Sequence, residues 1–236
     1  MSYLFISDLH LEDNRPDIAG IFVTWLNSKA RNAKALYILG DFFESWIGDD
    51  DLTVFHQEII SALKSATDAG LAIYFMHGNR DFLVGNRFLR ATGCQLLPEE
   101  HLLEIDSTRV LLMHGDTLCT EDTAYLKFRK KARNVFFQKL FLWKSLKTRR
   151  QIAANMREKS KAYTSTTPTH IMDVTQAEVE RVMQKHKATV LIHGHTHRPD
   201  THQFVLNNTE VKRIVLTPWH DHGYVFDWEL QKESMI

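Results

Sequence analysis

The stretch YLFISDLH, residues 3–10, introduces a pattern that recurs along the chain. An apolar run of strand length leads directly into Asp8 and His10, which are two positions apart. Alternate residues at the end of a strand point the same way, so these two side chains can bind one ion. The stretch therefore predicts a β-strand with metal-ligand residues at its carboxyl end.

Four later stretches repeat this arrangement. Each is a short run rich in β-branched or aromatic residues, followed by a polar cluster that contains glycine. The four pairs are 35–39 before Gly40-Asp41, 73–76 before HGNRD (77–81), 110–113 before HGD (114–116), and 190–192 before HGHTH (193–197). Since ligands collect at the carboxyl ends of strands in α/β folds, the five clusters are expected to converge.

The segments between the early runs have helical periodicity. Apolar residues recur at 18, 22, 25 and 26 within 18–31, and at 55, 59, 60 and 63 within 54–69. Residues 211–216 and 224–230 are expected to form further strands without an intervening helix. The pattern predicts a single α/β domain over residues 1–236, built as a two-sheet β-sandwich flanked by helices.

A long basic and apolar insertion separates His114 from His193. Between residues 127 and 161 there are thirteen Lys or Arg residues and one acidic residue, Glu158, interleaved with Phe, Leu, Val and Trp. We expect a helical cap at about 122–168, basic on one side and apolar on the other. Its apolar side either lines a groove for acyl chains or packs on the core, and the residues leave both open.

Composition limits the classes of function. The 236 residues carry 29 basic and 29 acidic side chains, so no global charge favours nucleic acid. The two cysteines are too few for a disulfide framework, which favours a reducing compartment. We see no signal peptide and no apolar run of the ~18 residues that a membrane span needs. The expected location is the cytosol, with peripheral contact to a membrane left possible.

The clusters supply the ligand types that divalent transition metals prefer. We expect one ion at Asp8, His10 and His197, and a second ion at Asn79, His114 and His195. Asp41 is the natural bridge, because a carboxylate has two oxygens. Two ions ~3.5–4 Å apart lower the pKa of a water molecule between them, which makes it a nucleophile near neutral pH.

In their order and spacing the five clusters resemble the calcineurin-like metallophosphoesterase family. Longer stretches, including YILGDFFESWIGDD (37–50) and LIHGHTHRP (191–199), resemble its members that hydrolyse UDP-2,3-diacylglucosamine. This resemblance implies attack at the α-phosphorus to give UMP and 2,3-diacylglucosamine 1-phosphate, a step in lipid A biosynthesis. It also implies two Mn²⁺ ions and peripheral association with the cytoplasmic side of the inner membrane of a Gram-negative bacterium.

Arg80 favours a phosphoanhydride substrate over a simple ester. Many relatives have a His here that can protonate an alkoxide, whereas Arg cannot act as an acid near neutral pH. Arg binds phosphate oxygens through parallel hydrogen bonds, and a phosphate leaving group needs charge stabilisation more than a proton. The alternative is a structural Arg paired with Asp81 or with the Asp49–Asp51 run. The expected catalytic residues are Asp41, Arg80 and His195.

The resemblance also implies a set of substrate contacts, of which two depart from the family pattern. The expected substrate-binding residues are Asn79, Arg80, Asp122, Ser160, Thr164, Thr167 and His195. Where relatives commonly have Asn and Lys, this chain has Thr164 and Thr167, whose hydroxyls replace hydrogen bonds but not the Lys charge.

Two rival functions differ from this hypothesis. One is a related dimetal phosphoesterase that acts on nucleotides or nucleic acid, for which a broad basic face is expected. The other is a non-catalytic, metal-bearing protein that binds at a membrane surface. Metal content without turnover on any diphosphate or phosphodiester would favour that second rival.

Overall fold

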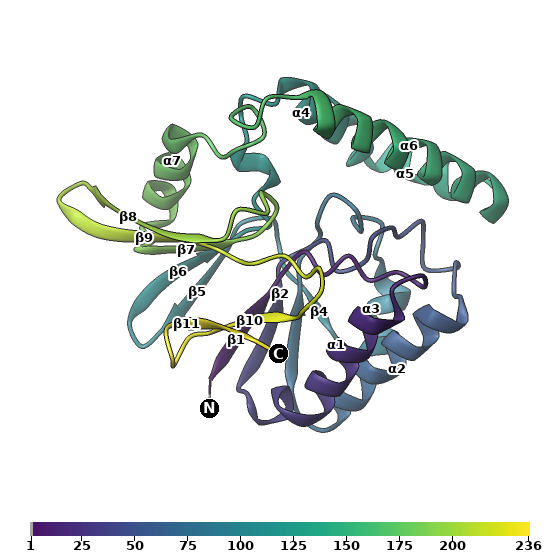
Figure 1. Ribbon diagram of the computed structural model, residues 1–236, viewed down its shortest axis with the longest axis horizontal. Coiled ribbons are helices and arrows are strands. Elements are labelled where there is room, and N and C mark those ends of the chain that lie inside the picture. The colour runs from purple at the N-terminus through teal and green to yellow at the C-terminus, as the bar shows by residue number, and fades with distance from the viewer. Residues whose placement is uncertain (1) are drawn as a thin grey trace.

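A computed structural model describes residues 2–236 of the chain. Two β-sheets stack face to face, and helices cover their outer faces (Figure 1). The two-sheet α/β sandwich expected from the sequence is therefore confirmed.

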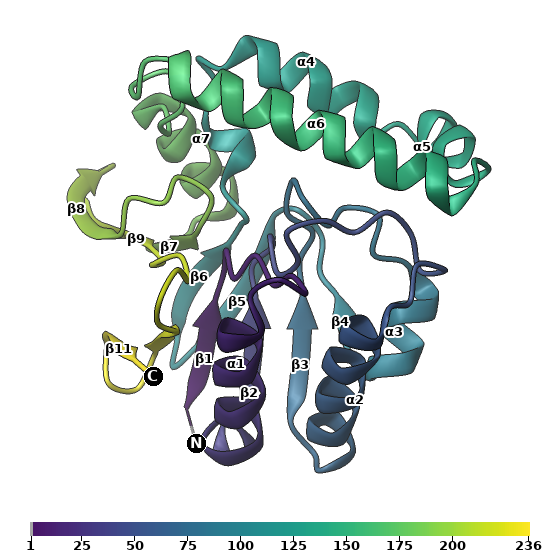
Figure 2. The ribbon, with the colours of Figure 1, turned by 45° about the vertical axis from the view of Figure 1, so that its right-hand side comes forward.

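The first sheet has the strand order β11-β10-β1-β2-β3-β4. Its strands are β1 (Tyr3–Ile6), β2 (Ala35–Ile38), β3 (Ala72–Phe75), β4 (Gln95–Leu96), β10 (Tyr224–Asp227) and β11 (Lys232–Met235). Strands β1 to β4 are parallel, whereas β10 pairs antiparallel with β1. Helices α1 (Pro16–Ser28) and α2 (Val54–Asp68) connect β1, β2 and β3 and lie together on one face of this sheet (Figure 2).

The second sheet has the order β5-β6-β7-β9-β8. Its strands are β5 (His101–Ile105), β6 (Thr108–Leu112), β7 (Val190–His193), β8 (Asp200–Leu206) and β9 (Thr209–Val215). The three central strands run parallel, and β5 and β8 pair antiparallel at the edges. Helix α7 (Gln176–His186) packs against this sheet through Val179, Val182 and Met183.

The buried apolar residues form three clusters that follow these layers. The cluster between the sheets includes Phe5 and Tyr37, whose rings stack with centroids 5.1 Å apart. A second cluster lies under α1 and α2 and includes Phe22 and Leu63, and a third lies under α7. Because both faces of the parallel strands are packed, their carboxyl ends form a rigid edge that can hold side chains in place.

Helix boundaries differ slightly from the periodicity. Helix α1 starts at Pro16, two residues before the expected start, because proline is well suited to the first turn of a helix. It ends at Ser28, and a short 3₁₀ turn, Ala30–Asn32, follows it. Helix α2 begins at Val54, where the Thr53 side chain accepts a hydrogen bond from the His56 amide. A short helix, α3 (Asn86–Thr92), and a 3₁₀ turn, Asp116–Leu118, complete the core loops.

Three helices between β6 and α7 form what we call the cap: α4 (Thr123–Ala132), α5 (Val135–Leu142) and α6 (Leu146–Thr166). Helices α4 and α6 run side by side above the carboxyl edge of the sheets, and α5 joins them at the far end (Figures 1 and 2). No residue of α4 or α5 is buried, and Arg149 is the buried residue of α6. The alternative in which the apolar side of the cap packs into the core is therefore wrong.

Across the described residues, 2–236, every helix is too short or too polar to cross a membrane.

Candidate dinuclear metal centre

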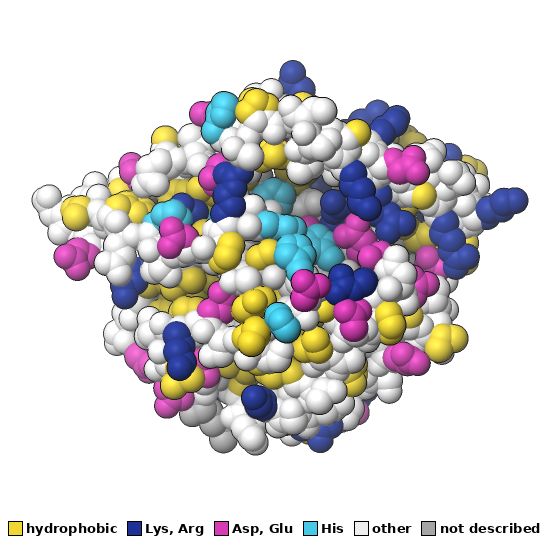
Figure 3. Space-filling view, in the orientation of Figure 1, with side chains coloured by type: hydrophobic (Ala, Val, Ile, Leu, Met, Phe, Trp, Pro, Cys, Tyr) yellow, Lys and Arg dark blue, Asp and Glu magenta, His cyan; other side chains and the backbone are white. Residues whose placement is uncertain are grey.

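The polar clusters meet beyond the carboxyl ends of β1, β2, β3, β6 and β7, in a hollow below the cap where histidines gather (Figure 3). Five of the residues in these turns have a positive backbone angle φ, which is uncommon for residues other than glycine. They are Asp8 (54°), His10 (50°), Asp41 (50°), His195 (69°) and His197 (54°). Such strained backbone conformations cost of order 1–3 kcal/mol each and cluster at functional sites.

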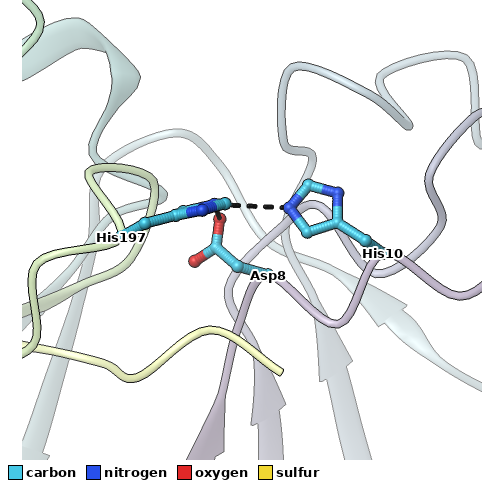
Figure 4. Close-up of side chains that lie close together, drawn as sticks. All are labelled: Asp8, His10 and His197. Carbon is cyan, nitrogen blue, oxygen red and sulfur yellow. Dashed lines mark hydrogen bonds and ion pairs between the residues drawn. The ribbon is translucent and has the colours of Figure 1, made fainter. Parts of the chain in front are cut away.

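One group consists of Asp8, His10 and His197, whose ligand atoms lie within 4.8 Å of one another. The His197 Nε2 atom is 3.4 Å from Asp8 Oδ1 and 3.3 Å from His10 Nε2 (Figure 4). Two imidazole nitrogens and one carboxylate oxygen that face a common point form the donor set of a transition-metal site. The grouping expected from the sequence is the one found.

The surroundings of this group favour positive charge. Burial opposes protonation of His10, but the hydrogen bond to Glu44 and the charges of Asp41 and Asp8 outweigh burial and raise its pKa to about 9. Burial raises the pKa of Asp8, yet the hydrogen bond and charge of His197, with the charge of His114, outweigh it and hold that pKa well below its usual range. The site therefore stabilises a cation.

A second group consists of Asp41, His114 and His195, whose ligand atoms also lie within 4.8 Å of one another. Asn79 joins this group, because its Oδ1 atom is 3.0 Å from His114 Nε2 and 2.9 Å from His195 Nδ1. The opposite nitrogen of His114 donates to the Leu39 carbonyl at 2.9 Å. That hydrogen bond fixes the proton on Nδ1, so that Nε2, which faces Asn79, would carry the lone pair that binds an ion.

The Asp41 carboxylate lies between the two groups. Its Oδ2 atom is 4.0 Å from His10 Nε2, and its Oδ1 atom is 3.8 Å from His114 Nε2. The Arg80 amide donates to Oδ1 at 2.8 Å, which holds the carboxylate in this orientation. With one oxygen toward each group, Asp41 has the geometry of a bridging ligand.

Two glycines allow these loops to approach so closely. A Cβ atom at Gly78 would lie 2.1 Å from Asp41 Oδ1, and one at Gly194 would lie 2.1 Å from Asp8 Oδ2. Behind them, the fully buried Asp81 accepts hydrogen bonds from the Gly78 and Phe42 amides. Burial and the neighbouring Asp41 charge raise the Asp81 pKa to about 6. Asp81 thus ties together the loops after β2 and β3.

Arg80 faces the centre without a strong partner. Its nearest carboxylate oxygen is Glu44 Oε1, 3.8 Å from a terminal guanidinium nitrogen. Its Nε atom is buried and has no hydrogen-bond partner among the described residues. The alternative in which Arg80 pairs with Asp81 is wrong, since Asp81 accepts backbone amides instead. The guanidinium is therefore available to an anion.

The run Asp49–Asp51 does not pair with Arg80. Asp49 accepts hydrogen bonds from the amides of Gly85, Arg87 and Phe88 and so caps the start of α3. Asp50 pairs with Arg149, and Asp51 pairs with Arg150. These two ion pairs attach the first turn of α6 to the core.

Asp116 attaches the other end of the cap. Its Oδ2 atom accepts hydrogen bonds from the Tyr125 hydroxyl and from Arg129 Nε, both at 2.6 Å. The Tyr125 ring lies 6.0 Å from the His195 ring. Burial raises the pKa of Asp116, but the charges of His114 and Arg129 outweigh it and keep that pKa well below its usual range. The cap is thus joined to the core next to the second ligand group.

The remaining expected substrate contacts lie on the cap. Asp122 is buried, and its Oδ1 atom accepts hydrogen bonds from the Tyr125 amide (2.9 Å) and the Tyr163 hydroxyl (2.8 Å). Thr167 donates its hydroxyl to the Tyr163 carbonyl at 2.8 Å. Ser160 is half-buried, and Thr164 is exposed. The structure brings Asn79, Arg80 and His195 together at the centre. Asp122 instead lies just before α4, and Ser160, Thr164 and Thr167 lie in or just after α6.

Glu44 is the main residue of the site that sequence reasoning missed. It lies three residues beyond Asp41 of the strand-end cluster, within GDFFES, and its Oε2 atom is 2.9 Å from His10 Nδ1. An acidic residue shortly after a ligand turn was the available signal. Tyr125 and Arg129 were also missed, because their role depends on the folded position of the cap.

The fold and the paired ligand groups define the class of this protein. Residues 1–199 match the family model for calcineurin-like phosphoesterases, and the chain belongs to that family. It is therefore a hydrolase of the metallophosphoesterase class, with ligand groups for two metal ions.

Curated relatives match most of the chain. One, named UDP-2,3-diacylglucosamine hydrolase, from Enterobacter sp. (strain 638), is 52% identical over 223 residues, which cover 94% of this chain and 93% of the relative. Another of the same name, from Pseudomonas putida (strain W619), is 48% identical over 98% of this chain and 95% of the relative. A solved structure described as a novel archaeal phosphodiesterase covers 100% of this chain and 99% of its own, with 15% identity and a TM-score of 0.49.

Proposed function

We propose that this protein hydrolyses the diphosphate bond of UDP-2,3-diacylglucosamine by attack on the α-phosphorus. The products are UMP and 2,3-diacylglucosamine 1-phosphate, and the reaction is a step in lipid A biosynthesis. The observation that carries the proposal is the Asp41 carboxylate, which has one oxygen near His10 of the first group and the other near His114 of the second. The Arg80 guanidinium, whose buried Nε atom has no hydrogen-bond partner among the described residues, adds to it. The names of relatives about half identical over nearly the whole chain support the choice of substrate.

The residues present fit two divalent cations. The buried Asp8 Oδ1 atom has no closer partner among the described residues than the His197 ring nitrogen, 3.4 Å away, although a buried carboxylate oxygen without a good partner is costly. Mixed imidazole, carboxylate and amide donors suit Mn²⁺, which we propose as the metal. The proposed ligands are Asp8, His10, Asp41, Asn79, His114, His195 and His197. When bound, two such ions supply the positive charge that lowers the pKa of a water molecule and neutralises phosphoryl oxygens.

The side chains around the centre have separate tasks. The Arg80 guanidinium binds the diphosphate and stabilises the phosphate that leaves, which needs no proton. Burial lowers the pKa of His195 to about 4, so its ring is neutral at pH 7 and has a lone pair to offer. We assign catalytic roles to Asp41, Arg80 and His195.

The cap is proposed to bind the lipid half of the substrate. We take residues 1–236 as one domain, with the insertion at about 122–168 covering the site. Asp122, Ser160, Thr164 and Thr167 are proposed to face the glucosamine phosphate, together with Asn79, Arg80 and His195. Half-buried apolar residues of the cap, such as Phe141 and Ile152, then line the path of the acyl chains.

Helix α5 is proposed to contact the cytoplasmic surface of the inner membrane. Phe136 is 65% exposed, Val135 63%, and Trp143, just after the helix, 89%. Lys139 and Lys144 lie in the same turns and are exposed. Exposed aromatic residues next to lysines are typical of proteins that bind anionic membrane surfaces peripherally.

The decisive experiment incubates Mn²⁺-loaded protein with UDP-2,3-diacylglucosamine in ¹⁸O-water. The expected result is one ¹⁸O atom in UMP and none in the lipid phosphate. Label in the lipid phosphate would show attack at the other phosphorus and contradict the mechanism. Protein stripped of metal by a chelator is the control, and it is expected to be inactive until Mn²⁺ is restored.

A further inference from the structure

A groove beside the metal centre belongs to neither ligand group. It lies between α6 and the two core segments that follow β1 and β2, and its volume is about 290 Å³. A second cavity of about 280 Å³ shares four of its lining residues, Glu12, Asn14, Glu44 and Arg157. Together they form a continuous groove along α6. Figure 3 shows acidic and basic side chains gathered beside the histidines below the cap.

The groove begins at the reacting centre. Glu44 is part of its wall, and the same carboxylate lies 2.9 Å from His10 Nδ1 and 3.8 Å from Arg80. A phosphorus atom held at the ligand groups and at Arg80 is therefore next to the mouth of the groove. The groove thus offers a path by which one of the two arms attached to a diphosphate can leave the centre.

The chemistry of the groove decides which arm it accepts. Its wall is largely polar, with Glu12, Asp13 and Asn14 on one side and Arg150 and Arg157 on the other. An acyl chain placed along these charged groups would remove their hydration, which is costly. The large exposed apolar side chains of the cap lie instead on and around α5. The polar arm of the substrate is the one that suits this groove.

We propose that this groove binds the nucleoside half of the substrate, a pyrimidine base with its ribose. This inference rests on the proposed function, since it assigns a place to one half of that substrate. The exposed Asn14 amide offers a donor and an acceptor side by side, which complement the N–H and C=O edge of uracil. The Glu12 carboxylate accepts hydrogen bonds from ribose hydroxyls, as an acidic residue does in dinucleotide sites.

Phe55 supplies the apolar surface of the site. Its half-buried ring lines the groove and packs against the core under α2, so it is rigid enough for a base to stack on it. Arg157 lies 4.0 Å from Glu12 and borders both cavities, which places a cation on the path between base and phosphate. A base, a ribose and a phosphate thus each have a matching side chain.

Binding of UMP and of ribose 5-phosphate to Mn²⁺-loaded protein, measured by titration calorimetry, tests this assignment. Both ligands offer a phosphate to the metal centre, but UMP alone offers a base. The ratio of the two affinities is the result: wild-type protein is expected to bind UMP at least ~10-fold more tightly than ribose 5-phosphate. Asn14→Ala and Phe55→Leu are each expected to reduce that ratio severalfold, whereas Asn27→Ala, an exposed residue of α1 outside the groove, leaves it unchanged.

Equal affinity of the wild type for the two ligands would overturn the inference, and so would a ratio that survives both groove variants. Thermal unfolding of each variant shows that it is folded. Turnover of UDP-2,3-diacylglucosamine separates the two proposals. If Asn14→Ala and Phe55→Leu turn over this substrate with unchanged KM, the assignment of the groove to the nucleoside is refuted and the proposed function stands. No turnover by the wild type, with UMP binding that depends on Asn14, refutes the function and leaves the groove intact.

Discussion

Glu44 Oε2 lies 2.9 Å from His10 Nδ1, so a carboxylate that binds no ion in either ligand group orients one of the proposed ligands. Such outer partners fix the ring and increase its basicity, and their loss typically costs 10–100-fold in metal affinity.

We therefore predict that Glu44→Gln lowers the affinity for one of the two Mn²⁺ ions by about 10–100-fold, because the neutral amide no longer supports the His10 ring. Calorimetric titration of metal-free protein with Mn²⁺ measures the change. Glu58→Gln, at an exposed position of α2, is the matched control and is expected to keep both affinities. Two unaltered binding steps in Glu44→Gln would contradict this role.

Asp41→Asn is predicted to lose at least one bound ion and about 10³-fold or more in kcat, because a neutral amide cannot bridge two cations with two anionic oxygens. Metal content by mass spectrometry and turnover of UDP-2,3-diacylglucosamine are the two measurements. Asp68→Asn, an exposed residue at the end of α2, is the control. Full metal content with intact turnover in Asp41→Asn would remove the basis for a dinuclear mechanism.

Arg80→Ala is predicted to lose about 10²–10³-fold on the diphosphate substrate but less than about 10-fold on bis(p-nitrophenyl) phosphate. The guanidinium stabilises a leaving phosphate, whereas the aryl diester has no second phosphate to bind. Comparison of kcat/KM for the two substrates gives the result. Equal losses on both would show that Arg80 acts on the attacked phosphorus or on the fold.

Replacement of the exposed apolar side chains by a charge is predicted to weaken membrane binding. Phe136→Asp and Trp143→Asp should each reduce co-sedimentation with phosphatidylglycerol vesicles about 10-fold, since burial of one aromatic side chain contributes about 1.5–3 kcal/mol. Val54→Asp is the control, because Val54 is 74% exposed but lies at the start of α2, outside the cap. Turnover of bis(p-nitrophenyl) phosphate, which is water-soluble, should stay unchanged in all three variants.

Cys94 is predicted to resist iodoacetamide at pH 8.5 in the folded protein. Burial raises the pKa of its thiol to about 11, so almost no thiolate forms at that pH. In the unfolded chain the thiol ionises near its ordinary pKa. Stability from the neutral thiol is therefore present below pH 9 and lost as the pH rises toward 11. Mass spectrometry with and without denaturant gives the labelling, and rapid modification of folded protein would contradict the buried position.

Much of the metal centre could be predicted from the sequence, because its signal is local. Each expected ligand follows shortly after a strand, and the rule that parallel strands end at one edge brings Asp8, Asp41 and Asn79 together at the edge of the first sheet. The expected groupings correspond to the two groups in the structure, although the ligand roles themselves remain predictions. The seven residues required no knowledge of distant contacts.

Contacts that depend on the position of the cap could not be predicted in this way. From the sequence, Asp50 is considered only as a partner of Arg80, yet it pairs with Arg149, about a hundred residues away. Tyr125 and Asp116 form a hydrogen bond only because α4 lies over the centre. No local pattern encodes such pairs, since they depend on how the inserted helices lie on the core.

Both ligand groups draw on the loop after β7, through His195 in one and His197 in the other, while their first members are Asp41 and Asp8. A nascent chain therefore cannot assemble either group until the ribosome has released residues beyond 197. Complete ligand groups therefore form only after synthesis of most of the polypeptide. A partly made or cleaved chain that lacks this loop has at most two members of each three-residue group.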